Sequence, residues 1–283
     1  MRRRPVAPRR FRLSKSARLA FFLLILGLPL ASNASADQLA DIKSKGKLVC
    51  GTLGTSEPFS FQDPATREIV GYDVDMCRKV AEALGVALEI KTISVEARIP
   101  ELVLGRVDIL AANLGYTKER AAQIAYSDTY FVSAQKILVR GDSGITKLDE
   151  LREKKISAVK GSSSEQGLHR LMPSATVLTY QDGSTAFLAV DQGKVAGFCA
   201  SELVLVRLKA RAQSAISIIY EPLFVEEWGL GVRKDEQGFR EAVNGALAGM
   251  ERSGDAQRLF ERWFGDGTLY KMKREFTIAP IKG

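Results

Sequence analysis

Strand-like and helix-like segments alternate along residues 47–264. Short apolar runs bounded by turn residues predict strands, and apolar residues three or four positions apart predict helices. Strands are predicted at 47–53, 88–93, 107–112, 156–159, 176–180, 195–200, 216–220 and 230–233. Helices are predicted at 73–84, 96–104, 165–171, 184–191, 202–210, 236–251 and 255–264, and a hairpin at 59–72. This alternation predicts an α/β fold of mostly parallel sheets flanked by helices, with ligands bound beyond the carboxyl ends of the strands.

The first 36 residues have the pattern of a cleavable signal peptide. A basic stretch that includes Arg2 and Arg18 precedes an apolar run at 19–30, and small residues follow up to Ala34-Ser35-Ala36. The apolar run is about a dozen residues long, whereas a membrane-spanning helix needs about 20. A signal peptide is therefore favoured over an uncleaved anchor, and we expect the protein in the periplasm.

The basic character of the chain comes from this leader. The sequence contains 41 Lys and Arg residues and 33 Asp and Glu residues. Eight of the basic residues and none of the acidic residues lie at 1–36, so 33 of each sign remain. A net charge near zero gives no support for binding to nucleic acid or to a membrane surface. The remaining part of the chain has the length of one large domain or of two lobes.

Cysteine and histidine are scarce. Cys50, Cys77 and Cys199 occur in a chain that we expect to be exported, where a disulfide is stable. Cys50 lies on the first predicted strand and Cys77 on a helix expected beside it, so this pair is favoured, with three buried free thiols as the alternative. The single histidine, His169, excludes sites with two or three histidine ligands. We expect no metal and no cofactor.

Small hydroxylated residues follow the predicted strand at 156–159. The run Gly161-Ser162-Ser163-Ser164 comes directly before the next predicted helix, where free backbone N–H groups and hydroxyl groups can bind a polar group. Taken alone, a serine run at this place is more often an ordinary helix cap. Asp73 and Asp75, at the start of the helix at 73–84, are also interpreted as helix-capping residues.

Eight short motifs carry a resemblance to a known family. They are Glu57-Pro58-Phe59-Ser60-Phe61, Gly71-Tyr72-Asp73-Val74-Asp75, Arg98-Ile99-Pro100-Glu101-Leu102, Gly105-Arg106-Val107-Asp108, Thr117-Lys118-Glu119-Arg120, Tyr126-Ser127-Asp128-Thr129-Tyr130-Phe131, Lys160-Gly161-Ser162-Ser163 and Arg262-Trp263-Phe264-Gly265. Each is weak alone, but together they span the chain after the leader. In them the chain resembles extracellular solute-binding protein family 3, the periplasmic polar amino acid-binding proteins of ABC transporters.

The resemblance implies a type II periplasmic binding protein fold with two lobes, each a mostly parallel sheet flanked by helices. The chain would cross between the lobes near 130–134 and near 225–228. Lobe 1 would comprise 37–131 and 229–283, and lobe 2 would comprise 135–224. Both lobes would close on a ligand in the cleft like a hinged clamp. The implied partners are an amino acid-like solute and a membrane permease, and we expect a monomer.

The resemblance also implies ligand contacts. Arg120 would hold the carboxylate of the ligand through two charge-assisted hydrogen bonds, and Thr117 would cap the short helix that carries it. Ser162 or Ser163 would contact the ligand at the start of a second helix. Phe59 is a further expected contact.

Some positions depart from the pattern of the family. Next to Asn113, the hydroxyl side chain that relatives often carry is missing at Gly115, although the N–H of Gly115 can still donate. Ser201 stands where an aspartate commonly binds the α-amino group of the ligand. Either Glu202 replaces that aspartate, or the ligand has no conventional α-ammonium, or both residues merely begin a helix. Ser56 replaces an aromatic residue that covers the ligand in many relatives.

Binding of a solute without catalysis is the favoured function. The alternative on the same fold is a periplasmic cyclohexadienyl or arogenate dehydratase, which needs a carboxylic acid in the cleft to protonate a leaving hydroxyl. Glu202 is the candidate for that acid. Because a fold alone does not decide function, turnover of prephenate separates the two hypotheses.

Overall fold

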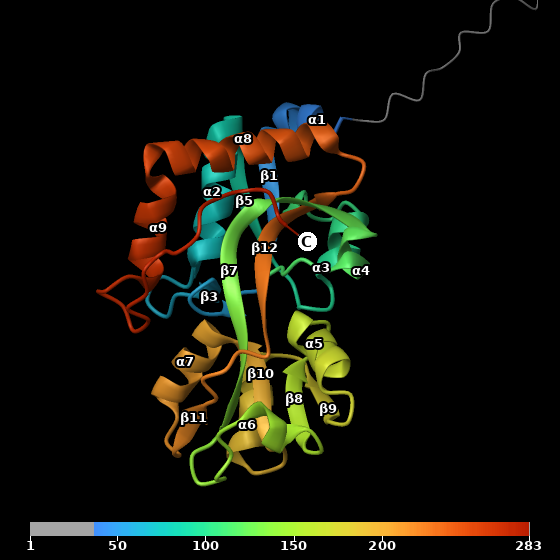
Figure 1. Cartoon of the computed structure of the whole chain (residues 1–283). Coiled ribbons are helices and arrows are strands. Elements are labelled where there is room, and N and C mark those ends of the chain that lie inside the picture. Colours follow the sequence, from blue (N-terminus) through green and yellow to red (C-terminus); the bar gives the residue numbers. More distant parts are fainter. Residues whose placement is uncertain (1–36, 283) are drawn as a thin grey trace, which may run out of the picture. The chain divides into compact units, whose positions relative to one another are not determined.

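Two long strands, β7 (Ile124–Arg140) and β12 (Phe224–Arg233), run side by side through the computed structural model, which describes residues 37–282. They pair antiparallel, with Trp228 opposite Phe131 and Val225 opposite Ala134. In Figure 1 they connect an upper group of helices and strands with a lower group. The predicted signal peptide at 1–36 lies outside the described residues.

The two long strands form the middle of a nine-stranded sheet. The upper strands β6, β1 and β5 continue the sheet from β12, and the lower strands β10, β8 and β9 continue it from β7. We call the part of the protein around β6, β1 and β5 the upper half and the part around β10, β8 and β9 the lower half. A further strand, β11, also pairs with β7. The bounds of these strands are β1 (Lys47–Thr52), β5 (Ala87–Thr92), β6 (Ile109–Leu110), β8 (Lys155–Val159), β9 (Thr176–Tyr180), β10 (Gly197–Ser201) and β11 (Ile216–Ile218).

Parallel pairing is confined to the outer strands of this sheet. β1 pairs parallel with β5 and β6, and β8 pairs parallel with β9 and β10. The long strands pair antiparallel with each other and with β6 and β10. The predicted α/β fold class is confirmed. The sheet is mixed rather than mostly parallel, because strand–helix–strand units give parallel pairs only among the strands that they connect.

The hairpin predicted at 59–72 forms part of a separate antiparallel sheet. Its strands are β2 (Thr55–Ser56), β3 (Ser60–Gln62) and β4 (Ile69–Val70). After β4, Gly71 has a φ of 139°, and a Cβ atom there would lie 2.1 Å from the carbonyl oxygen of Phe59. Glycine is needed at this position because the two backbone segments touch. The close approach lets Tyr72 and Asp73 donate their backbone N–H groups to Pro58 and Phe59 as the next helix begins.

The predicted helices agree with the structure to within two residues at each end. The bounds are α1 (Gln38–Lys45), α2 (Tyr72–Leu84), α3 (Arg98–Val103), α4 (Lys118–Ala121), α5 (Ser163–Leu171), α6 (Gly183–Asp191), α7 (Glu202–Arg211), α8 (Gln237–Ser253) and α9 (Asp255–Phe264). The short helix α1 and a 3₁₀ turn at Leu148–Leu151 are additional to the prediction.

An aromatic cluster forms the core of the upper half. The ring of Phe59 lies 4.8 Å from that of Trp228, 5.1 Å from that of Phe131 and 5.4 Å from that of Phe264, measured between centroids. All four side chains are fully buried, and burying one large apolar side chain stabilises a fold by about 1.5–3 kcal/mol. The cluster fixes the two long strands against α9 and the hairpin.

A disulfide bond joins Cys50 on β1 to Cys77 on α2, the pairing that the sequence favoured. It lies in the same core and ties a strand of the sheet to the helix that covers it. The third cysteine, Cys199 on β10, is a buried free thiol.

The lower half has an apolar core on each face of its strands. Successive residues of β7 alternate between them, since Leu138 packs in one core while Ile137 and Val139 pack in the other. These cores are separate from the aromatic cluster of the upper half. The lobe boundaries at 131, 135, 224 and 229 fall on β7 and β12 and stay a prediction.

Candidate functional site

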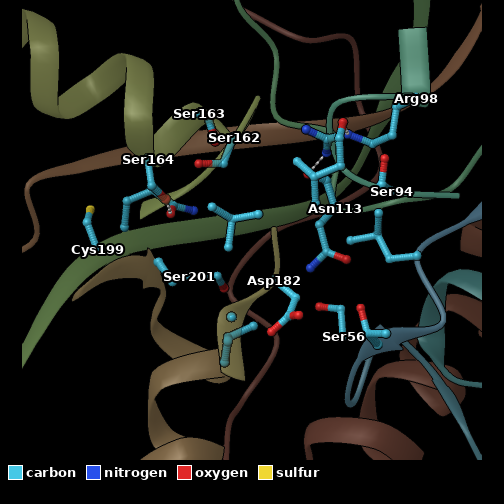
Figure 2. Close-up of a pocket in the computed structure, with 18 of the residues that line it drawn as sticks. Ser56, Ser94, Arg98, Asn113, Ser162, Ser163, Ser164, Asp182, Cys199 and Ser201 are labelled. Atoms are coloured by element: carbon cyan, nitrogen blue, oxygen red, sulfur yellow. Dashed lines mark hydrogen bonds between the residues drawn. The ribbon is translucent and has the colours of Figure 1, made fainter. Parts of the chain in front are cut away.

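A cavity of about 400 Å³ is lined by both halves of the described chain. The upper half contributes several polar side chains, among them Ser56, Ser94, Arg98 and Asn113. The lower half contributes further polar side chains, among them Ser162, Ser163, Asp182 and Ser201. In the view of Figure 2, the serines of α5 face Arg98 and Asn113 across the cavity, with Ser201, Asp182 and Ser56 below them.

Several of the lining residues lie at or just beyond the carboxyl ends of parallel strands. Ser162 follows β8, Asp182 follows β9, Asn113 follows β6, and Ser201 is the last residue of β10. At these ends the following helices present backbone N–H groups that have no partner within the helix. This is the place at which α/β sheets bind ligands.

The serines at the start of α5 line the cavity, as the sequence led us to expect, but their hydroxyl groups already have partners. Ser162 caps the helix, and its Oγ accepts a hydrogen bond from the N–H of Glu165 at 3.1 Å. Ser163 donates to Oε1 of Glu226 at 3.0 Å, and Ser164 donates to Oε1 of Gln135 at 2.7 Å. Ser162 therefore caps α5 and forms part of the cavity wall at the same time.

Arg98, at the start of α3, presents a buried guanidinium to the cavity. Its Nε donates to the carbonyl of Val95 at 2.8 Å, and its Nη1 donates to Ala112 and Asn113 at 2.8 and 2.9 Å. Its Nη2 donates to the carbonyl of Gly161 at 3.1 Å, in the lower half. Four backbone carbonyls thus hold this cation, and no carboxylate is bonded to it within residues 37–282.

Arg120 is buried but does not line the cavity. Its Nη1 donates to Gly115 at 2.8 Å and its Nη2 donates to Gly161 at 3.0 Å, so the carbonyl of Gly161 accepts from two guanidinium groups. Burial and the neighbouring charge of Arg120 lower the pKa of Arg98 to about 9. Thr117 caps α4 as predicted, accepting from the N–H of Arg120. A ligand carboxylate on Arg120 stays a prediction.

Asn113 is held in a left-handed conformation, with φ of 51°, by a buried carboxylate. Its N–H donates to Asp73 Oδ2 at 3.0 Å, and the hydroxyl of Tyr130 donates to Asp73 Oδ1 at 2.8 Å. The prediction that Asp73 caps a helix is wrong, because α2 has no side-chain cap and the carboxylate points into the protein. The side-chain oxygen of Asn113 is buried without a hydrogen-bond partner among the described residues.

Glu226, on β12, places a buried carboxylate in the cavity wall. Its Oε1 accepts from Gln135 at 2.9 Å, from Ser163 at 3.0 Å and from Trp228 Nε1 at 2.7 Å. A Cβ atom at Gly115 would lie 2.1 Å from its Oε2, so the missing side chain at 115 makes room for this carboxylate. Burial raises the pKa of Glu226, while these hydrogen bonds and nearby guanidinium groups favour the charged form.

Ser201 and Glu202 have different surroundings. Ser201 lines the cavity and accepts a hydrogen bond from the hydroxyl of Ser133 at 3.0 Å, and it makes no side-chain cap on α7. Glu202 does not line the cavity, and its carboxylate is bonded to Nζ of Lys136 at 2.6 Å. Glu202 therefore does not take the place of the missing aspartate in this structure.

Ser56 and Phe59, two further residues considered from the sequence, also have different surroundings. Ser56 lines the cavity, and so does Val95. Phe59 does not, because its ring is fully buried in the aromatic core. A ligand contact at Phe59 stays a prediction, and in this structure its ring packs against Trp228, which lines the cavity.

Five further residues line the cavity although no sequence pattern predicts a role for them: Arg98, Gln135, Asp182, Arg207 and Glu226. Asp182 had a signal, because an aspartate just before a predicted helix is a typical cap, and its Oδ1 accepts from the N–H of Thr185. Gln135 and Glu226 have no such sequence signal, because they lie on parts of the long strands β7 and β12 that the hydrophobic pattern does not predict.

The described residues contain no cluster of three or more His, Cys, Asp or Glu residues that could hold a metal ion. Among the helices at 37–282, none is both long and apolar enough to cross a membrane.

Comparison with known proteins gives the family. Residues 48–266 match the bacterial extracellular solute-binding proteins, family 3. The ABC transporter glutamine-binding protein GlnH of Bacillus subtilis (strain 168) is 28% identical over 237 residues, which are 82% of this chain and 86% of that protein.

Solved structures agree with this match. An ancestral arginine-binding protein bound to arginine has a TM-score of 0.73 and 32% identity, covering 78% of this chain and 99% of its own. The ancestral amino acid-binding protein AncCDT-1, a precursor of cyclohexadienyl dehydratase, has a TM-score of 0.74 and 28% identity, covering 81% and 100%. These likenesses confirm the type II periplasmic binding protein fold. The chain belongs to the bacterial extracellular solute-binding proteins, family 3.

Proposed function

We propose that this chain is the substrate-binding subunit of an ABC importer and captures an amino acid or a related small polar solute. The observation that carries the proposal is the polar cavity at the strand ends, which both halves line. Its volume of about 400 Å³ lies in the range of small-molecule sites, with a few polar groups to orient the ligand. The similar proteins include a glutamine-binding protein of an ABC transporter and an ancestral arginine-binding protein bound to arginine.

Ion pairs between the upper and lower halves support closure of two lobes. The proposed lobe 1 comprises 37–131 and 229–283, and the proposed lobe 2 comprises 135–224. Lys160 bonds Glu96 at 2.7 Å and Arg211 bonds Glu57 at 2.8 Å, each pair joining the two halves. Exposed ion pairs of this kind stabilise by about 0–1 kcal/mol, so they favour closure only weakly. A solute that contacts both halves adds the free-energy difference that keeps the clamp closed.

Ligand contacts are proposed for side chains that line the cavity from both halves. Asn113 offers an unpaired oxygen, and Ser56 and Ser201 offer hydroxyl groups. The N-terminus of α5, with Ser162 and Ser163, offers the positive end of the helix dipole. Together these groups suit a small solute that carries both donors and acceptors.

We further infer that the chain binds its solute without transforming it. The acid proposed for a dehydratase, Glu202, is bonded to Lys136 and lies away from the cavity wall. The named relatives are binding proteins, although AncCDT-1 is a precursor of an enzyme. Formation of phenylpyruvate from prephenate by the purified protein would contradict this inference.

Location and partners follow from the same proposal. The predicted signal peptide at 1–36 would direct the protein to the periplasm, where it would deliver its solute to a membrane permease. We expect a monomer, and light scattering coupled to size exclusion tests that expectation directly.

A thermal-shift screen of residues 37–283, which form one compact unit, tests the binding function. The panel contains the common amino acids, their decarboxylated counterparts and prephenate. A solute at a hundred times its dissociation constant stabilises the folded state by about 2.7 kcal/mol, which raises Tm measurably. A panel that leaves Tm unchanged at millimolar concentration would overturn the proposed solute class.

Asn113→Gly serves as the site variant in this screen, because glycine adopts the left-handed backbone without strain. It is expected to reduce or remove the shift. Gln123→Ala is the matched control, since Gln123 is an exposed amide that does not line the cavity. Equal shifts in both variants would place the solute elsewhere.

A further inference from the structure

We propose that an ammonium group of the solute binds between Glu226 and Asn113, with the carboxylate of Glu226 as its counter-ion. The proposal rests on the proposed solute-binding function and adds the residue that recognises a cationic group. Ser201 stands where the family resemblance implies an aspartate for this role, and Glu202 bonds Lys136 instead. The predicted contact of Arg120 with the carboxylate of the solute is left unchanged.

The carboxylate of Glu226 is buried with only one of its oxygens bonded. The residue is 8% exposed and lines the cavity from β12. Its Oε1 accepts hydrogen bonds from three side chains, those of Gln135, Ser163 and Trp228. Its Oε2 is buried and has no donor among residues 37–282. A buried carboxylate oxygen without a donor costs free energy, so this oxygen calls for a donor from outside the chain.

The guanidinium groups near Glu226 do not supply that donor. Arg98 donates to four backbone carbonyls, and Arg120 donates to the carbonyls of Gly115 and Gly161. Burial raises the pKa of Glu226, whereas its hydrogen bonds and the charges of Arg120 and Arg98 act in the opposite direction. A cationic solute group at Oε2 would favour the charged form further.

Asn113 provides a second buried acceptor without a donor. Its side-chain oxygen is unpaired among the described residues, and the residue lines the cavity. Its backbone is fixed, because its N–H donates to Asp73 at 3.0 Å. Two residues further along, a Cβ atom at Gly115 would lie 2.1 Å from Oε2 of Glu226. The two unpaired oxygens therefore belong to neighbouring parts of the cavity wall.

An ammonium group suits two such acceptors better than a hydroxyl group does. It carries three N–H donors, whereas a hydroxyl group carries one. It also neutralises the buried carboxylate, and charge-assisted hydrogen bonds are roughly twice as strong as neutral ones. An anionic group placed at Glu226 would meet a like charge in a buried site. The two acceptors thus select a cationic end of the solute.

The other carboxylates are less suited to this role. Among residues 37–282, only Asp182 and Glu226 place a carboxylate in the cavity wall. Asp182 is partly exposed, and its Oδ1 accepts from the N–H and the hydroxyl of Thr185 as the cap of α6. Asp73 is buried, but it does not line the cavity and both of its oxygens have donors. Glu226 is therefore the buried carboxylate of the wall that still needs a donor.

The position of Glu226 also connects the proposed contact to closure. Its carboxylate bonds Ser163 of α5 in the lower half and lies against Gly115 in the upper half. The last torsion of a glutamate side chain has a broad preference, so the carboxylate can turn toward a solute without movement of the backbone. An ammonium group bound there would lie where the two halves meet and would favour the closed form.

Titration calorimetry of residues 37–283 tests recognition of the ammonium group. The probes are L-arginine, L-glutamine and L-glutamate, followed by any other amino acid that raises Tm in the thermal-shift screen. Each is paired with its des-amino acid, which is δ-guanidinovalerate, glutaramate or glutarate for the first three. The wild type should bind an amino acid about 100-fold more tightly than its des-amino partner, because the partner leaves the buried carboxylate unpaired.

Glu226→Gln keeps the length of the side chain and one acceptor oxygen but removes the charge. It should bind the amino acid about 100-fold more weakly than the wild type and lose the discrimination against the des-amino partner. Glu226→Asp keeps the charge but withdraws it by one methylene group, so a loss of about tenfold is expected. This second variant gives the same comparison if Glu226→Gln does not fold.

Glu227→Gln is the matched control. Glu227 is the next residue on β12, does not line the cavity, and accepts from the N–H of Lys282. This variant should bind both members of each pair as the wild type does.

The outcomes separate the ammonium site from the proposed function. Failure of every amino acid to bind the wild type overturns the proposed solute class, and the ammonium site with it. An amino acid that binds Glu226→Gln as tightly as the wild type overturns the ammonium site alone. An equal loss of affinity for both members of a pair also overturns it, because Glu226 would then serve only the shape of the cavity.

Discussion

The guanidinium of Arg98 donates a hydrogen bond of 3.1 Å to the carbonyl of Gly161, 63 residues further along the chain. Arg98 begins α3 in the upper half, whereas Gly161 follows β8 in the lower half. The same guanidinium holds the carbonyls of Val95, Ala112 and Asn113. One side chain therefore shapes the upper wall of the cavity and also joins the two halves across it.

Arg98→Ala is expected to lower the free energy of unfolding by about 3 kcal/mol, because buried carbonyls lose a charged donor. Urea unfolding of residues 37–283 measures this loss. Solute affinity should fall as well, since the loop at Asn113 loses its support.

Arg106→Ala is the control for this variant. Arg106 has a side chain that is 59% exposed and bonds Glu101 at 2.8 Å, so its removal should cost less than about 0.5 kcal/mol. A similar loss in both variants would show that the carbonyl contacts of Arg98 add nothing specific.

Gly115→Ala tests the close approach of Glu226. The new Cβ atom would meet Oε2 at 2.1 Å, and the displaced carboxylate would lose its three donors. We expect a loss of about 2 kcal/mol in urea unfolding, as for other overpacked buried sites.

Gly245→Ala provides the comparison. A Cβ atom at Gly245, within α8, meets nothing within 4 Å, so alanine should stabilise the protein by about 0.5–1 kcal/mol. If Gly115→Ala behaves in the same way, the carboxylate of Glu226 is free to move and the described contact is not a constraint.

Much of the fold follows from local patterns. The helices at 73–84 and 255–264 have apolar residues at helical spacing, and Thr117 is a capping residue just before α4. The 17-residue strand β7 has no such signal, because it mixes buried polar residues such as Ser133 and Gln135 with apolar ones. A strand pattern based on hydrophobicity misses a strand whose polar side chains are buried against a cavity.

The candidate site could be predicted only in part, for the same reason. Ser162, Ser201 and Asn113 follow predicted strands, so chain order alone places them near the cavity. Glu226 and Arg207 come from β12 and α7, and their presence in the wall depends on how the two halves meet. Phe59 and Glu202 do not line the cavity, because the ring of Phe59 packs in the aromatic core and the carboxylate of Glu202 bonds Lys136. Sequence spacing does not resolve such differences in side-chain direction.

The disulfide between Cys50 and Cys77 closes a loop with a sequence separation of 27. Closing a loop of this length restricts the unfolded chain and stabilises the folded state by about 3–4 kcal/mol. The double variant Cys50→Ala with Cys77→Ala should therefore unfold at a lower urea concentration than the wild type.

Reductant distinguishes this effect from simple loss of packing. Dithiothreitol should destabilise the wild type by a similar amount and leave the double variant unchanged. Cys199→Ala, which removes the buried free thiol, should remain sensitive to reductant. A wild type that is indifferent to dithiothreitol under unfolding conditions would contradict the bond.

Asp73 is expected to make stability depend on pH, because burial raises its pKa to about 6 despite hydrogen bonds from Tyr130 and Asn113. The unfolded carboxyl has a pKa of about 3.9, so between about pH 4 and 6 the folded state binds more protons. The contribution of Asp73 to stability is therefore fully present below about pH 4 and is lost as pH rises through 6.

The variant Asp73→Asn tests this pH dependence, because asparagine does not titrate. The wild-type free energy of unfolding minus that of Asp73→Asn should fall by about 2–3 kcal/mol from pH 4 to pH 7, because each pKa unit corresponds to about 1.4 kcal/mol. Urea unfolding at four pH values measures this difference, in which other titrating groups largely cancel. A difference that stays flat over this range would mean that Asp73 is ionised throughout.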